Sequence, residues 1–244
     1  MSKRLKWILG GGGVAAIAVA AFVYFVVLGD ADDSVSLESA VEAVTGDPTP
    51  LESQPANTTA DTAVAAAAGL DGSWTLADGL DSFVGYRVQE ELSPIGANTA
   101  TGRTRAVSAT LEIEGSEITD VFVDADVSQL QSDQSNRDRA LRSRGLESSS
   151  LPQATFQLTQ SIEIGSVPAD GESISVSASG DLTAHGVTRS VTAAIEAQLT
   201  DGVVAVVGTI DINLSDFDIT GLTGFAVLSV QDAGQLEFQL LFSR

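Results

Sequence analysis

Apolar and polar residues alternate along most of the chain after residue 72, which is the pattern of β-strands with one buried and one solvated face. The clearest alternation flanks Ala184–Val187, with serines at every second position of residues 173–179 and apolar residues at every second position of 191–199. His185, the only histidine of the chain, and Gly186 lie between these two segments. Because glycine adopts positive φ without strain, Ala184–Val187 is predicted to reverse the chain in a tight hairpin turn.

Similar alternating segments recur with turn residues between them. Asp201-Gly202 is a strong signal for a two-residue hairpin turn. Ser135–Arg144 has helical character, with Asp133 or Ser135 as candidate N-caps. The predicted fold is therefore all-β, an antiparallel sandwich or barrel of about eight strands with at most one short helix. The alternating segments cover residues 74–76, 82–88, 99–114, 118–127, 154–164, 173–182, 191–199, 203–214 and 235–242.

The N-terminal part has a different pattern. Residues 8–28 are uncharged and mostly apolar, and at about 1.5 Å per residue they are long enough to cross a hydrocarbon core of about 30 Å. Lys3, Arg4 and Lys6 precede this run and acidic residues follow it, which predicts a cytoplasmic N-terminus, residues 1–7, and an extracytoplasmic C-terminal part. Residues 28–31 fit a cleavage site poorly, so a retained single-pass signal anchor in the cell membrane is favoured over a cleaved signal peptide.

Residues 29–71 are rich in Ala, Ser, Thr, Pro and acidic residues and have little periodicity, which predicts a disordered linker. Pro48, Pro50 and Pro55 interrupt any helix, although Ser36–Val44 is compatible with a short one. A flexible chain of about 40 residues has a root-mean-square length of roughly 35 Å. The linker is therefore expected to lift a folded domain, residues 72–244, off the bilayer.

Charge and composition exclude several classes of function. The chain has 12 Lys+Arg against 33 Asp+Glu, and the part after the apolar run carries all 33 acids against 9 arginines, a net charge of −24. So acidic a domain is not expected to bind nucleic acid. With no cysteine and one histidine, most metal cages and thiol mechanisms are excluded. No nucleophile elbow or phosphate loop is present. We therefore expect no metal, no cofactor and no enzymatic activity.

Small side chains recur on the faces predicted to point inward, for example Ala109, Ala125 and Gly180. An eight-stranded barrel either fills its interior with side chains or holds one small ligand. Small inward residues leave room, so the pattern favours an apolar cavity, although larger residues opposite them are an alternative filling. The predicted cavity wall consists of Ala125, Phe156, Leu158, Ala178, Leu182, Ala193, Ile195, Ala197 and Phe238.

An arginine cluster lies in the predicted helix of this otherwise acidic chain: Arg137, Arg139, Arg142 and Arg144. Guanidinium groups suit phosphate, so Arg137, Arg142 and His185 are candidates for contacting the head group of a ligand. The alternative is an exposed helix whose arginines pair with acids such as Asp138 and Glu147, each pair contributing only about 0–1 kcal/mol. His185 has no catalytic partner visible in the sequence and is expected to form a hydrogen bond that fixes its turn.

Residues 180–189 read GDLTAHGVTR. This segment resembles the pattern G-[DN]-L-T-[IL]-H-G-V-T-[RK] of the YceI-like family. Residues 136–142 are similar to R-D-x-H-L-R, with alanine in place of histidine, and residues 151–156 to Y-P-x-A-x-F. Weaker similarities at residues 74–83 and 215–219 follow the same order, so the resemblance covers residues 72–244.

The resemblance implies an extended, lipocalin-like antiparallel β-barrel that holds a polyisoprenoid or similar long-chain lipid in its bore, in the bacterial cell envelope and without established catalytic residues. The sequence as a whole thus predicts a membrane-anchored, extracytoplasmic lipid-binding protein. One alternative is a tethered β-domain with a filled core that acts in protein interaction or envelope structure. A weaker one is a hydrolase or isomerase acting on a lipid.

Overall fold

The computed structural model of the 244-residue chain describes residues 32–46, 69–220, 222–224 and 227–244. The predicted membrane anchor, residues 8–28, and the linker residues 47–68 lie outside these ranges. Within them, no helix combines the length and the apolar character needed to cross a membrane.

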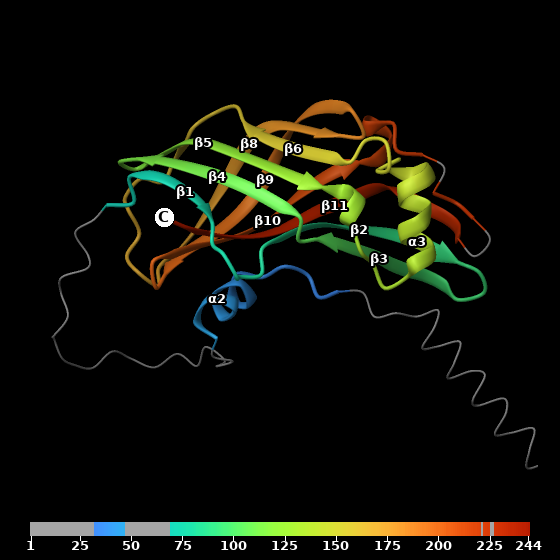
Figure 1. The fold of residues 1–244 in the computed structure, drawn as a ribbon, viewed down its shortest axis with the longest axis horizontal. Helices are drawn as coiled ribbons and strands as arrows, with labels where there is room; N and C mark the ends of the chain where they lie inside the picture. Colours follow the sequence, from blue (N-terminus) through green and yellow to red (C-terminus); the bar gives the residue numbers. More distant parts are fainter. Residues whose placement is uncertain (1–31, 47–68, 221, 225–226) are drawn as a thin grey trace, which may run out of the picture.

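Eight antiparallel strands form a closed β-barrel (Figure 1). The strands of the structure are β1 (Gly72–Leu76), β2 (Phe83–Leu92), β3 (Gly96–Thr104), β4 (Val107–Glu114), β5 (Glu117–Asp126), β6 (Gln153–Leu158), β7 (Ile162–Glu163), β8 (Ser173–Ala184), β9 (Val187–Thr200), β10 (Val203–Asn213) and β11 (Val227–Ser243). The ring runs β1-β4-β5-β6-β8-β9-β10-β11 and closes because β1 pairs with both β4 and β11. The hairpin of β2 and β3 extends from β11, and β7 pairs with β5. The predicted all-β barrel is confirmed.

Two predicted hairpin turns are present. His185 and Gly186 have φ angles of 51° and 73°, and Asp201 and Gly202 have 51° and 80°. Two successive residues with positive φ match the twist of the flanking strands, which makes such turns the preferred two-residue hairpin connections. The first turn sets the register of β8 and β9, which pair from Ala184 opposite Val187 to Ser173 opposite Gln198.

Three strand boundaries differ from the predicted ones. Residues 99–114 form two strands because Thr104 Oγ1 accepts from the Ala106 amide at 3.1 Å and donates to the Asp126 carbonyl, also at 3.1 Å, which bends the chain between β3 and β4. Residues 154–164 divide into β6 and β7 at residue 159, whose amide donates to the Ser179 carbonyl. β11 begins at Val227 rather than at the predicted Gln235. Register shifts against β2 interrupt the alternation of residues 227–234, so the pattern did not reveal this part of the strand.

Residues 32–46 pack against the outside of the barrel, so the prediction of a disordered linker is wrong for this segment, which we call the strap. Its helix α2 (Leu37–Thr45) begins at the N-cap Ser36, whose side chain accepts from the Ser39 amide, and ends at Gly46 with φ 67°. Ala40 is fully buried against Ala205, Val207 and Leu241 on the outer face of β10 and β11. The short helix that the sequence allowed at Ser36–Val44 is present, but its docking was missed because this contact joins residues far apart in the sequence.

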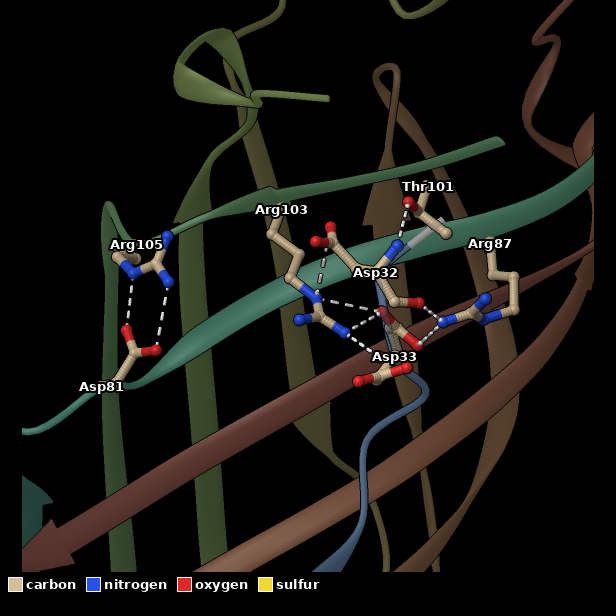
Figure 2. Close-up of polar contacts among 8 residues, drawn as sticks. Asp32, Asp33, Asp81, Arg87, Thr101, Arg103 and Arg105 are labelled. Carbon is tan, nitrogen blue, oxygen red and sulfur yellow. Dashed lines mark hydrogen bonds and ion pairs between the residues drawn. The ribbon is translucent and has the colours of Figure 1, made fainter. Parts of the chain in front are cut away.

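Polar contacts hold the beginning of the strap (Figure 2). The Asp32 amide donates to Thr101 Oγ1 at 3.1 Å, Arg87 donates to the Asp32 carbonyl at 2.6 Å, and Arg103 donates to the Asp33 carbonyl. The same two guanidinium groups pair with Glu237 of β11, which is only 1% exposed, at 3.4 and 2.9 Å. The strap therefore docks on an ion-pair cluster that also ties the β2–β3 hairpin to the ring.

We predict that Ala40→Asp detaches α2, because a carboxylate at this fully buried position would lose its hydration without a partner. Hydrogen exchange should show the opening free energy of the α2 amides falling by about 1–3 kcal/mol, while the amides of β8 and β9 keep their protection. The control Ser39→Asp adds the same charge at an exposed neighbouring position and should leave α2 docked. Unchanged α2 protection in Ala40→Asp would contradict the docked strap.

Candidate functional site

The barrel encloses a cavity of about 880 Å³. Side chains from β2, β4, β5, β6, β8, β9, β10 and β11 line it, and most of them are aliphatic or aromatic. Trp74 of β1 is 3% exposed and donates through Nε1 to the Leu70 carbonyl at 2.9 Å, within a packed cluster that includes the wall residues Leu111 and Phe242. The cavity wall next to β1 is therefore apolar.

Several inward-facing aliphatic side chains are only partly buried although they lie inside the ring. Val121, Val176, Ile195 and Val206 all line the cavity and all keep part of their surface exposed. In a barrel filled by its own side chains these residues would be buried completely. The open bore does not fit the alternative of a β-domain with a filled core.

Most of the predicted wall residues lie where the sequence places them. Ala125, Phe156, Ala178, Leu182, Ala193, Ile195, Ala197 and Phe238 line the cavity. Leu158, also predicted there, is not a wall residue: it is the last residue of β6 and is buried in a cluster with Ile162, Ala178 and Ala193. Contact of any of these residues with a ligand stays a prediction.

Two glycines explain how part of the interior is filled. A Cβ atom at Gly180 would overlap the Phe156 ring, and one at Gly208 would overlap the Phe238 ring. Each phenylalanine thus covers a glycine on a neighbouring strand and uses some of the space that the small residue leaves. The remaining space is the cavity, so the prediction of an apolar cavity holds, while the alternative of filling by larger residues applies locally at Gly180 and Gly208.

One end of the barrel, which we call the mouth, is bordered by residues 135–146, the turn at His185 and residues 222–224. The helix α3 (Ser135–Ala140) continues as a π-helical turn, Leu141–Gly145. Its N-cap position is Gln134, not Asp133 or Ser135 as predicted, and the Gln134 side chain makes no capping hydrogen bond. A side chain at Gly145 would overlap Leu222, so glycine allows the helical segment and residues 222–224 to pack closely.

Arg137 lies at the mouth, but its charge is compensated. Its guanidinium group binds Glu90 of β2 at 2.6 Å and also pairs with Asp133, instead of the expected helix neighbours. Glu90 is 6% exposed and accepts a further hydrogen bond from Asn98 at 2.8 Å. Burial by itself would lower the pKa of Arg137, but the negative charge of Glu90, together with smaller contributions from its other neighbours, raises it on balance. Arg137 therefore stays charged and paired.

Tyr86 is a polar residue on the cavity wall that the sequence reasoning did not single out. Its hydroxyl is buried and has no hydrogen-bond partner among the described residues. Its ring covers Gly102 of β3, where a Cβ would lie 2.6 Å from the ring. Burial raises the pKa of the phenol, so it stays a neutral donor. A lone tyrosine among the inward apolar residues of β2 is the signal that could have identified it.

The other predicted head-group residues differ in position. His185 lines the cavity, and its Nδ1 lies 3.0 Å from the Phe217 carbonyl, which requires a proton on Nδ1. This bond ties the turn to the short helical segment Leu214–Phe217, as expected for a residue that fixes its turn. Arg142 does not line the cavity, whereas Arg139 and Arg144 do. Arg142 is partly buried, whereas Arg139 and Arg144 are exposed at the border of the mouth.

The site combines a long apolar bore with a few polar groups at one end. Among the described residues, no three side chains of the metal-ligating types come together. The arrangement suits a ligand with a long apolar part and a small polar end.

Sequence comparison assigns the family. A family model described as the YceI-like domain matches residues 74–242. The chain belongs to the YceI-like family. A relative, the UPF0312 protein VPA0850 of Vibrio parahaemolyticus, is 30% identical over 140 residues, which cover 53% of this chain and 69% of that protein.

Two solved structures share the fold of this YceI-like domain. A polyisoprenoid-binding domain from Saccharophagus degradans, implicated in plant cell wall breakdown, has a TM-score of 0.54 and 16% identity and covers 70% of this chain and 97% of its own. BcnA of Burkholderia cenocepacia has a TM-score of 0.50 and 20% identity over 67% of this chain and 96% of its own. At these identities the similarity establishes the fold.

We predict that Glu90→Gln lowers the free energy of unfolding by about 1–3 kcal/mol, because it leaves the partly buried Arg137 with one carboxylate partner fewer. Urea denaturation of both proteins measures the difference. The matched control is Asp81→Asn, which removes the partner of Arg105 in a pair whose side chains are 66% and 47% exposed. Asp81→Asn should lower the free energy of unfolding by less than about 1 kcal/mol. Equal effects of the two substitutions would contradict a special role of the buried pair.

Proposed function

We propose that this YceI-like domain binds a long-chain apolar lipid of the polyisoprenoid class in the barrel cavity. The observation that carries the proposal is the apolar cavity of about 880 Å³, whose wall includes half-buried aliphatic side chains. Ligand sites of small molecules typically measure about 300–1,000 Å³. The similarity in fold to a domain described as polyisoprenoid-binding supports the same class of ligand.

Burial of the lipid chain supplies the binding energy. Each methylene group that leaves water contributes about 0.8 kcal/mol. About ten buried methylenes would contribute roughly 8 kcal/mol before the costs of immobilising the ligand. The fit requires no specific hydrogen bond along the bore, so ligands of similar length and width should compete for it.

The polar end of the ligand lies at the mouth in this proposal. Tyr86 supplies a buried neutral donor there, and His185, Arg139 and Arg144 border the same opening. Arg137 is held by Glu90, so it contributes a compensated charge rather than a free one. Arg142 is not a wall residue, so in this proposal it would contact a head group only outside the cavity.

The proposed location is the cell membrane, with residues 8–28 as a single-pass anchor and the barrel on the extracytoplasmic side. The three basic residues before the apolar run and the acids after it support this orientation. The role is that of a binding protein, and we assign no catalytic residue.

We predict that Ala197→Phe weakens lipid binding about ten-fold or more, because its ring would enter the bore from a position that is only partly buried. Titration of the full chain with a fluorescent long-chain polyene measures the affinity. Ala178 and Ala193 are poorer sites for this test, since they are 1% and 2% exposed and a larger side chain would strain the core.

The matched control is Ala194→Phe, which places the same ring on the exposed outer face of the same strand. It should bind the probe like the unmodified protein. Equal binding by Ala197→Phe and the unmodified protein, with both folded, would refute the cavity as the binding site.

A further inference from the structure

The mouth carries arginines that no acidic residue neutralises. Arg139, Arg142, Arg144 and Arg189 have no carboxylate within 4.0 Å among the described residues, whereas Arg137 does. The first three lie on or directly after α3, and Arg189 follows the turn at His185 closely. The first three arginines therefore gather at one border of the mouth of a domain whose net charge is strongly negative, whereas Arg189 lines a separate surface depression with Asp211 and Asp216.

Acidic residues near the helical segment have partners of their own. Glu90 and Asp133 bind Arg137. Asp138 accepts from the Ser132 hydroxyl at 2.6 Å and from its amide at 3.0 Å, and Glu147 lies 3.9 Å from His185 Nε2. Residues 135–146 carry four arginines and one acid, Asp138, so the helical border of the mouth is locally cationic.

An exposed apolar side chain lies at the same end. Leu228 is 57% exposed, the largest fraction among the exposed large apolar side chains of the described residues. It follows Val227, a wall residue that pairs with Leu92 at the end of β2. α3 and the β2–β3 hairpin lie together at the end of the molecule opposite the C-terminus (Figure 1). Cationic side chains around an apolar one match an anionic lipid surface.

The strap limits how far the barrel can move from an anchor. Asp32 is fixed on β2 and β3 by Arg87, Thr101 and Arg103 (Figure 2). If residues 8–28 cross the membrane as proposed, only three residues separate Leu28 from Asp32, which is four Cα–Cα steps. They span at most about 14 Å, whereas a free linker of about 40 residues would span roughly 35 Å.

We propose that the mouth face, defined as Arg139, Arg142, Arg144 and Leu228, docks on the surface of an anionic phospholipid bilayer. The cavity then opens toward the membrane, and an apolar ligand passes between bilayer and barrel without crossing water. Passage of a ligand between bilayer and barrel rests on the proposed lipid-binding function. The contact of the mouth face with the bilayer is measurable whether or not the cavity holds a ligand.

Because the chain has no cysteine, a single introduced cysteine can report the contact. The full chain carrying Leu228→Cys, labelled with an environment-sensitive fluorophore, is reconstituted into vesicles of phosphatidylcholine alone or mixed with phosphatidylglycerol. We expect a several-fold rise in emission with the anionic vesicles, reduced by high salt. Lipid-attached quenchers should quench this emission.

Three variants serve as controls. A label at Val167→Cys should show no such rise. Val167 is exposed and precedes the start of β8, whose other end leads to the turn at His185. In the Leu228→Cys protein, Arg139→Gln, Arg142→Gln and Arg144→Gln combined should abolish most of the rise, whereas Arg105→Gln, at an exposed pair elsewhere, should not. Equal emission at positions 228 and 167, or a rise that does not depend on anionic lipid or on the three arginines, overturns the docking proposal.

Probe titration of the same preparations separates the two proposals. Unimpaired lipid binding without the emission change refutes the docking alone. The emission change without any lipid binding supports the docking and refutes the proposed ligand function.

Discussion

The pairing of β1 with both β4 and β11 closes the ring, and the rest of the structure depends on this closure. Only five residues long, β1 places Trp74 opposite Leu111 and Leu76 opposite Phe242. Because the ring is closed, every inward-facing position points to a common space and not to a partner sheet. Alanines and glycines at many of these positions leave that space partly unfilled, and the cavity follows from the combination of closure and small side chains.

Two ion-pair clusters supplement the strand pairing of this ring. Glu90 and Arg137 join β2 to α3 and thereby hold the helical border of the mouth. Glu237, with Arg87 and Arg103, joins β11 to the β2–β3 hairpin and offers the strap a place to dock. Buried charges of this kind are costly unless fully paired, so each cluster fixes the position of the elements it connects.

The sequence allowed the prediction of features that depend on local pattern. Alternation identified the strands, His185-Gly186 identified a hairpin turn, and the small inward residues indicated a cavity. Features that depend on distant contacts were not predictable. Glu90 meets Arg137 across 47 residues, and Arg103 meets Glu237 across 134. The strap was assigned to a disordered linker, since its apolar face is too short to stand out without the surface of β10 and β11 that covers it.

Native mass spectrometry of the unmodified full chain, purified gently from its source cells, shows directly whether the barrel holds a lipid. We expect a protein peak with an added mass that organic solvent removes and that corresponds to one long-chain isoprenoid-type lipid. A protein that is consistently free of any added mass, and that takes up no polyisoprenoid supplied in excess, would contradict it.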